Sequence, residues 1–111
     1  MLDGRAESRA ESRLRVVLMR ADITGYEPNH WVSLPRPRVR YRIDIAFPAA
    51  MLGLEYQGEY HHDIGQWRDD MTRLSRLRAY GWNMVEVSAR DLDDPAELAD
   101  RIRRLLLLRR E

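Results

Sequence analysis

The sequence predicts one α/β domain in which helices flank a mixed sheet of four strands. Three observations predict this class. Residues 39–47, VRYRIDIAF, alternate strictly between apolar and polar side chains, as a half-buried strand does. Two segments, about 7–21 and 65–80, repeat apolar residues at helical spacing. The segment between the strand ending at residue 57 and the next strand is long enough for a parallel crossover.

The first four elements begin with the helix over about 7–21, where Leu14, Val17, Leu18 and Ala21 form the apolar stripe. Glu11 shares that stripe, one turn before Leu14. A short strand is expected near 29–34, and the strand 39–47 follows after the turn PRPR. A further strand covers 52–57, and its spacing from 39–47 predicts a hairpin.

The last three elements are a helix, a strand and a helix. The helix over about 65–80 has Trp67, Met71, Leu74 and Leu77 as its apolar stripe, and Gly81 is placed to end it. The segment WNMVEVSA is a fourth strand, and a leucine- and arginine-rich helix covers 95–109. The order is therefore α-β-β-β-α-β-α, in one domain over 1–111.

Composition excludes several classes of function. The chain has 111 residues and no cysteine, so it can form neither a disulfide framework nor a thiolate metal site. No apolar run approaches the ~20 residues that span a bilayer, and the charged start lacks the apolar centre of a signal peptide. We therefore expect a cytoplasmic protein with no membrane partner. All 19 basic residues are arginine, so every cationic phosphate contact must use a guanidinium.

One group of residues carries chemistry. If the strands 39–47 and 52–57 pair, Asp44 and Glu55 can stand side by side. Two carboxylates ~4 Å apart repel by about 4 kcal/mol at an effective dielectric constant near 20, so either one is protonated or a cation lies between them. Two carboxylates, the carbonyl of Tyr56 and waters form the environment that Mg²⁺ prefers, and Mn²⁺ is the alternative ion. Gln57, on the same face as Glu55, can orient a metal-bound water.

Two further residues complete the predicted site. His61 can take a proton from that water, because imidazole titrates near neutrality. Glu11, on the inner face of the first helix, can add a carboxylate. Adjacent His61 and His62 with Asp63 could instead form a zinc site, but neighbouring histidines seldom converge on one ion.

These residues resemble a known family. Asp44 followed by EYQ at 55–57 is similar to the D…E-x-K core of the PD-(D/E)XK nucleases, with Gln57 at the lysine position. The segments ESRLR, YRIDIAFP, LEYQGEYHH and RDDMTRLSRLRAYGW together resemble uncharacterised bacterial domains related to very-short-patch repair endonucleases. The resemblance covers nearly the whole chain. The sequence lacks the cysteine- and histidine-rich zinc site of the true repair enzymes, so mismatch repair is not implied.

The resemblance implies a restriction-endonuclease-like core and a magnesium-dependent DNA endonuclease. Asp44 and Glu55 would bind the ion, Glu11 would support the site, and His61 matches the histidine that follows the glycine in these domains. Arg73 would face the site or a phosphate. Such domains often form the C-terminal part of longer proteins with an N-terminal winged-helix segment.

Other interpretations of the same residues stay open. Asp44 could simply form an ion pair with Arg40 or Arg42, and Glu55 could form a similar pair. Arg40 and Arg42 share the strand face of Asp44, where they could bind phosphates or form a solvated face. The missing lysine favours a degenerate nuclease fold that binds nucleic acid or protein without cutting.

The leucine run 105–108 of the last helix raises a further alternative. It is too apolar all round for a free surface helix, so it packs on the core or on a partner. The domain could then be an assembly module, such as a homodimer.

Overall fold

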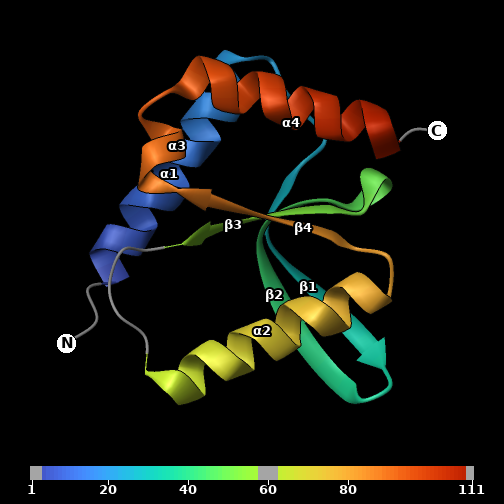
Figure 1. The fold of residues 1–111 in the computed structure, drawn as a ribbon. Helices are drawn as coiled ribbons and strands as arrows, with labels where there is room; N and C mark the ends of the chain where they lie inside the picture. Colours follow the sequence, from blue (N-terminus) through green and yellow to red (C-terminus); the bar gives the residue numbers. More distant parts are fainter. Residues whose placement is uncertain (1–3, 58–62, 110–111) are drawn as a thin grey trace.

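The structure is a computed structural model that describes residues 4–57 and 63–109 (Figure 1). Its elements, in chain order, are α1 (Gly4–Arg20), β1 (Glu27–Pro35), β2 (Arg38–Phe47), the 3₁₀ helix η1 (Pro48–Ala50), β3 (Leu52–Gln57), α2 (Ile64–Ala79), β4 (Asn83–Ser88), α3 (Ala89–Leu92) and α4 (Pro95–Arg109). The expected order of helices and strands is confirmed. The short helix α3 was not expected, because four residues carry no periodic pattern.

The four strands form one mixed sheet in the order β1-β2-β3-β4. β1 pairs antiparallel with β2 and β2 antiparallel with β3, whereas β3 and β4 are parallel and α2 connects them. Helices α1, α3 and α4 lie on one side of the sheet, and α2 lies on the other (Figure 1). The predicted α/β class, with helices flanking a mixed four-stranded sheet, is therefore confirmed.

Two hydrophobic clusters hold the helices to the two sides of the sheet. The cluster under α1 and α4 joins buried residues of both helices to inner side chains of β2, β3 and β4, among them Leu14, Leu18, Ile45, Leu54, Val87, Leu98 and Ile102. The cluster under α2 is smaller and consists of Ile43, Ala46, Leu74, Leu77, Trp82 and Met84. Between these clusters the sheet is buried on both faces at its centre.

Strand β2 changes the direction of its apolar side chains at Asp44. Ile43 belongs to the cluster under α2, whereas Ile45 belongs to the cluster under α1 and α4. Strict alternation over 39–47 predicted one shared face for these two residues, and that prediction is wrong. The irregularity coincides with Asn29, opposite Asp44 on β1, which has φ of 52° and interrupts the recorded pairs.

The apolar stripe of α2 is buried along only half of its length. Leu74 and Leu77 are buried, but Trp67 is 58% exposed and Met71 45% exposed. The prediction that all four residues pack on the core is therefore wrong for the first two. In Figure 1 the N-terminal half of α2 extends past the strands, so no sheet lies beneath it.

The C-terminal leucine run is divided in a similar way. Leu105 and Leu106 pack against the cluster under α1 and α4, whereas Leu107 and Leu108 are exposed. None of the helices over the described residues is both long enough and apolar enough to cross a membrane.

Candidate active site

The site is built where β2 and β3 stop pairing. Their register runs from Phe47 opposite Leu52 to Ile45 opposite Leu54. Asp44 and Glu55 are the next residues of the two strands beyond this last pair. The two acids therefore lie at the point where the strands separate, close to the C-terminal end of β3.

Glu55 is the one buried charged residue among the residues whose burial the structure describes, at 6% exposure. Its side chain points to α2, where Arg73 donates to both of its carboxylate oxygens; the Nη1–Oε2 distance is 3.0 Å. Asp70, one turn earlier on α2, accepts from Nε and Nη2 of the same guanidinium at 3.2 and 3.0 Å. Arg73 is thus fixed between two carboxylates and carries the charge that compensates Glu55.

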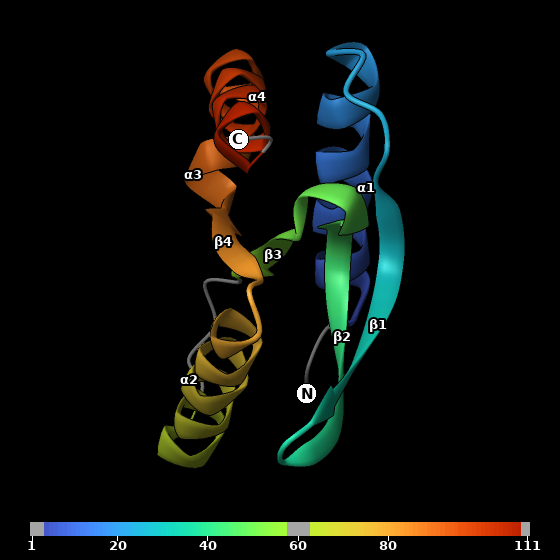
Figure 2. The ribbon, with the colours of Figure 1, turned by 90° about the vertical axis from the view of Figure 1, so that its right-hand side faces the viewer.

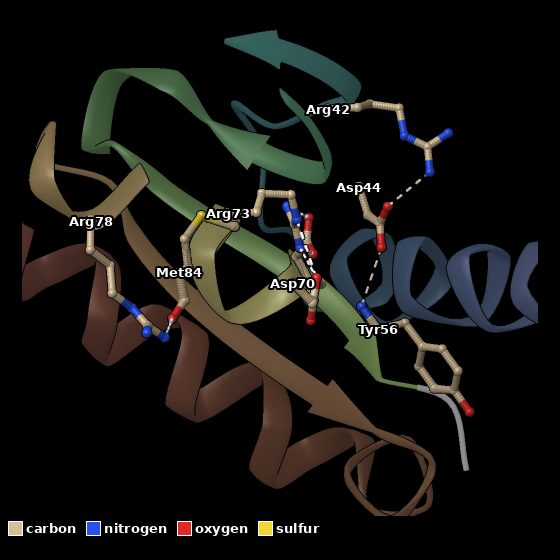
Figure 3. A network of polar contacts seen from close by, with 8 residues as sticks. Arg42, Asp44, Tyr56, Asp70, Arg73, Arg78 and Met84 are labelled. Atoms are coloured by element: carbon tan, nitrogen blue, oxygen red, sulfur yellow. Dashed lines mark hydrogen bonds and ion pairs between the residues drawn. The ribbon is translucent and has the colours of Figure 1, made fainter. Parts of the chain in front are cut away.

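Asp44 has different partners. Its Oδ1 accepts from Arg42 at 3.3 Å, and its Oδ2 accepts from the backbone N–H of Tyr56 at 3.3 Å. Figure 3 shows the Asp44 carboxylate between the Arg42 side chain and the Tyr56 backbone. The hydrogen bond to Tyr56 connects β2 to β3 beyond the last ladder pair, so Asp44 closes the gap between the separating strands.

The two carboxylates are electrostatic neighbours although they have separate arginine partners. Burial raises the pKa of Glu55, and the negative charges of Asp44 and then Asp70 raise it further, while the hydrogen bonds and charge of Arg73 oppose the shift. The ion pair between Asp44 and Arg42, one of the open interpretations of the sequence, is present.

The other predicted residues surround this pair to different degrees. Gln57 ends β3, is half-buried and lies two positions beyond Glu55. Glu11 is half-buried on α1, which packs against β3. His61 and His62 lie outside the described residues, so their predicted roles stay predictions. In the described ranges 4–57 and 63–109, no three Asp, Glu or His side chains converge as a ready metal-binding group.

The arginines predicted to bind phosphates lie on both sides of the acids. Arg42 contacts Asp44 directly. Arg40 lies two residues before Arg42 on β2, and its guanidinium carbon is 4.8 Å from the centre of the Trp31 ring. Arg73 faces Glu55 from α2 and is mostly buried.

Two contacts of the site were missed by the sequence analysis. The first is the role of Asp70 as a second partner of Arg73, which the i, i+3 spacing on a helix could have indicated. The second is the Tyr56 N–H as a donor to Asp44, which no sequence signal reveals.

The chain resembles known proteins in sequence and in fold. No protein-family model matches it. Two proteins of Mycobacterium tuberculosis, "Uncharacterized protein MT2308" and "Uncharacterized protein Rv2248", are each 34% identical to it over 116 residues. Each match covers 94% of this chain but only 39% of the relative, so the chain spans well under half the length of these relatives.

The fold matches that of a solved nuclease domain. The structure titled "Homing Endonuclease I-Bth0305I Catalytic Domain" superposes with a TM-score of 0.70 at 20% sequence identity, covering 89% of this chain and 94% of that chain. This chain therefore has the fold of an endonuclease catalytic domain. The resemblance to very-short-patch repair endonucleases and to the PD-(D/E)XK motif stays a prediction.

Proposed function

We propose that this domain is a divalent-metal-dependent DNA endonuclease that hydrolyses phosphodiester bonds. The observation that supports the proposal is that Asp44 and the buried Glu55 lie on the neighbouring strands β2 and β3, directly beyond their last pair, Ile45 and Leu54. The fold shared with a homing endonuclease catalytic domain supports the same reaction class. The activity, substrates and partners of any longer protein that contains this domain belong to the same proposal.

The residues of the site fit Mg²⁺ or Mn²⁺. Asp44 and Glu55 would supply two carboxylates, and the carbonyl of Tyr56, whose N–H donates to Asp44, would be the third protein ligand. Hard cations of this kind prefer such oxygen ligands and retain several waters. When bound, the ion would polarise a phosphate oxygen and lower the pKa of a bound water.

The remaining residues have defined tasks in this proposal. Gln57 orients the attacking water, and His61 accepts its proton or binds a phosphate. Glu11 supports the acids from α1. Both oxygens of Glu55 accept from Arg73, and each keeps a second lone pair with which it could bind an ion. The guanidinium of Arg73 would also contact a phosphate, because its planar group matches phosphate oxygens in pairs.

A second function, nucleic-acid or protein binding without cleavage, is supported by the same ion pair. The bidentate Arg73–Glu55 contact satisfies both oxygens of the buried acid without a metal. Gln57 also replaces the lysine of the D…E-x-K pattern. The two functions differ in one measurable respect. An endonuclease hydrolyses DNA and needs Asp44 and Glu55 to do so, whereas a binding module does not hydrolyse DNA.

A cleavage assay with three variants tests the proposal. Plasmid, linear duplex and single-stranded DNA are incubated with the domain in Mg²⁺, in Mn²⁺ and in EDTA. We expect cleavage only with a divalent ion, and a loss of at least ~100-fold in Asp44→Asn and in Glu55→Gln, because each removes an ion ligand. The control is Asp100→Asn, whose carboxylate pairs with Arg104 on the exposed face of α4.

The assay separates the two functions. Calorimetric titration of Mg²⁺ should show binding by the wild-type protein and by Asp100→Asn, and weak or no binding by Asp44→Asn. Cleavage of equal rate in the wild type and in Glu55→Gln would place the reaction elsewhere. An inactive wild type that binds no ion would leave the binding module as the function.

A further inference from the structure

The β1–β2 hairpin has one buried and one exposed face. The register pairs Trp31 with Arg42, Ser33 with Arg40 and Pro35 with Arg38, and all six of these residues are exposed. We call them the hairpin surface. The opposite face is formed by buried or half-buried side chains, namely His30, Val32, Leu34, Val39, Tyr41 and Ile43. Figure 2 shows the hairpin continuing well beyond β3, away from α1 and α4.

The hairpin surface carries positive charge that is only partly compensated. It contains three arginines and no acidic residue. Arg42 is paired with Asp44, but across residues 4–57 and 63–109 neither Arg38 nor Arg40 forms an ion pair with a carboxylate. The chain as a whole has a net charge of only +1, so this surface is a local concentration of cations. Such a stripe attracts phosphates.

Trp31 adds an aromatic surface to these cations. Its side chain is 53% exposed, and the guanidinium carbon of Arg40 lies 4.8 Å from the ring centre. A cation stacked over an indole is attracted by the π-electrons and holds the ring in place. An exposed, fixed aromatic ring beside arginines is the arrangement on which unpaired bases stack.

We infer that the hairpin surface binds single-stranded DNA, with phosphates on Arg38 and Arg40 and an unpaired base stacked on Trp31. A base in a duplex is covered on both faces by its neighbours, so Trp31 can stack only on a base that is unpaired. The six positions from Arg38 to Asp44 span ~20 Å at about 3.3 Å per residue. A strand that follows the hairpin surface therefore leads to the acids, and this part of the inference rests on the proposed function.

Binding measured without divalent ions tests the inference separately from cleavage. Fluorescence anisotropy in EDTA compares a labelled 15-mer with its duplex, for the wild type and four variants. We expect the wild type to bind the single strand more tightly than the duplex, and Trp31→Ala to lose about tenfold in affinity, since one stacked base contributes ~1–3 kcal/mol. Trp31→Phe should retain most of the affinity, because it keeps an aromatic ring.

The matched control is Trp67→Ala. Trp67 is 58% exposed, close to the 53% of Trp31, but it lies on α2 and outside the hairpin surface. Its removal should leave the affinity unchanged, and Arg40→Gln should weaken binding and reduce the salt dependence. Equal affinity of Trp31→Ala and wild type, or duplex bound as tightly as the single strand, would overturn the inference. Absence of cleavage with this binding pattern intact would sink the proposed function alone.

Discussion

At the scale of single residues, the most constrained group is the carboxylate of Glu55. A carboxylate at 6% exposure is stable only with strong hydrogen-bond partners, and Arg73 supplies two donors in one plane. Asp70 also accepts from Nε and Nη2 of the same guanidinium (Figure 3). Arg73 is therefore held in place by Asp70 while its charge compensates that of Glu55.

Replacing Arg73 with alanine should therefore destabilise the domain strongly. The variant leaves Glu55 buried without a compensating charge, which we expect to lower the free energy of unfolding by about 3 kcal/mol at pH 7. Arg104→Ala is the control, because Arg104 and its partner Asp100 are both exposed, and it should change stability by less than ~0.5 kcal/mol. Urea unfolding measures both.

A second background identifies the cause of the loss. In Glu55→Gln the buried charge is absent, so Arg73→Ala should be less damaging there than in the wild type. An equal loss in both backgrounds would mean that Arg73 stabilises the fold by packing rather than by compensating Glu55.

At the scale of elements, the junction between β4 and α4 depends on a reciprocal cap. Ser88 accepts from the backbone N–H of Asp91, and the Asp91 carboxylate accepts from the backbone N–H of Ser88. Arg101 of α4 reaches back to Asp91 at 2.8 Å. The cap thus sets the direction in which the chain leaves the sheet for α4.

The same cap makes stability depend on pH. The hydrogen bond from the Ser88 backbone, with a further contribution from Arg101, holds the pKa of Asp91 below its ordinary value of 3.8. A lowered carboxyl pKa stabilises the folded state above pH 3.8, and this contribution is lost as pH falls through the folded-state value. Asp91→Asn should lower the free energy of unfolding by about 1 kcal/mol at pH 7 and by less at pH 2.

Guanidinium chloride unfolding at both pH values measures this effect. Asp100→Asn, on the exposed face of α4, is the control and should show no such difference between the two pH values. A loss that is as large at pH 2 as at pH 7 would show that the charge of Asp91 is not the stabilising feature.

The apolar stripe of α2 contains one buried and one exposed residue whose contributions to stability can be compared. Leu74 is 1% exposed and belongs to the cluster under α2, so Leu74→Ala should cost about 2–5 kcal/mol. Trp67, on the same stripe, is 58% exposed, so Trp67→Ala should cost less than ~0.5 kcal/mol. Thermal unfolding distinguishes the two. Comparable losses would show that Trp67 is packed in solution.

The periodicity of the sequence predicted the approximate boundaries of most elements. It did not predict which cluster each apolar residue packs in. The pattern of 39–47 predicted a strand, yet it could not reveal that Ile43 and Ile45 enter different clusters, because a change of face needs the geometry of the neighbouring strand. Similarly, the stripe of α2 indicates an amphipathic helix, but sequence spacing does not give the length of the sheet beneath it. The pairing of the two strands that carry Asp44 and Glu55 was predictable because a short turn joins them. The bond from Tyr56 N–H to Asp44 was not, since backbone donors are the same at every residue.

At the scale of the whole molecule, the sheet separates two cores that should respond independently to mutation. Ile43 lies in the cluster under α2, and Ile102 lies in the cluster under α1 and α4. Truncating either to valine should cost about 1 kcal/mol. Because the two sites share no partner across the sheet, the double variant should lose the sum of the two values within ~0.5 kcal/mol. Chemical unfolding of both single variants and the double variant measures this, and a clear departure from additivity would mean that the sheet transmits strain between its faces.

The charged residues of the site come from parts of the chain at different sequence separations, and this affects how the protein folds. Asp44 and Glu55 belong to neighbouring strands joined by a short turn, whereas Arg73 is delivered by the crossover between β3 and β4. Local contacts of this kind form readily, and long-range ones come later because more chain must be ordered first. A chain with its hairpins formed but α2 undocked would expose Glu55 to the charge of Asp44 with no guanidinium opposite. Docking of the helix supplies the guanidinium of Arg73 and relieves that repulsion, so the central strands should reach their full stability only once α2 has docked.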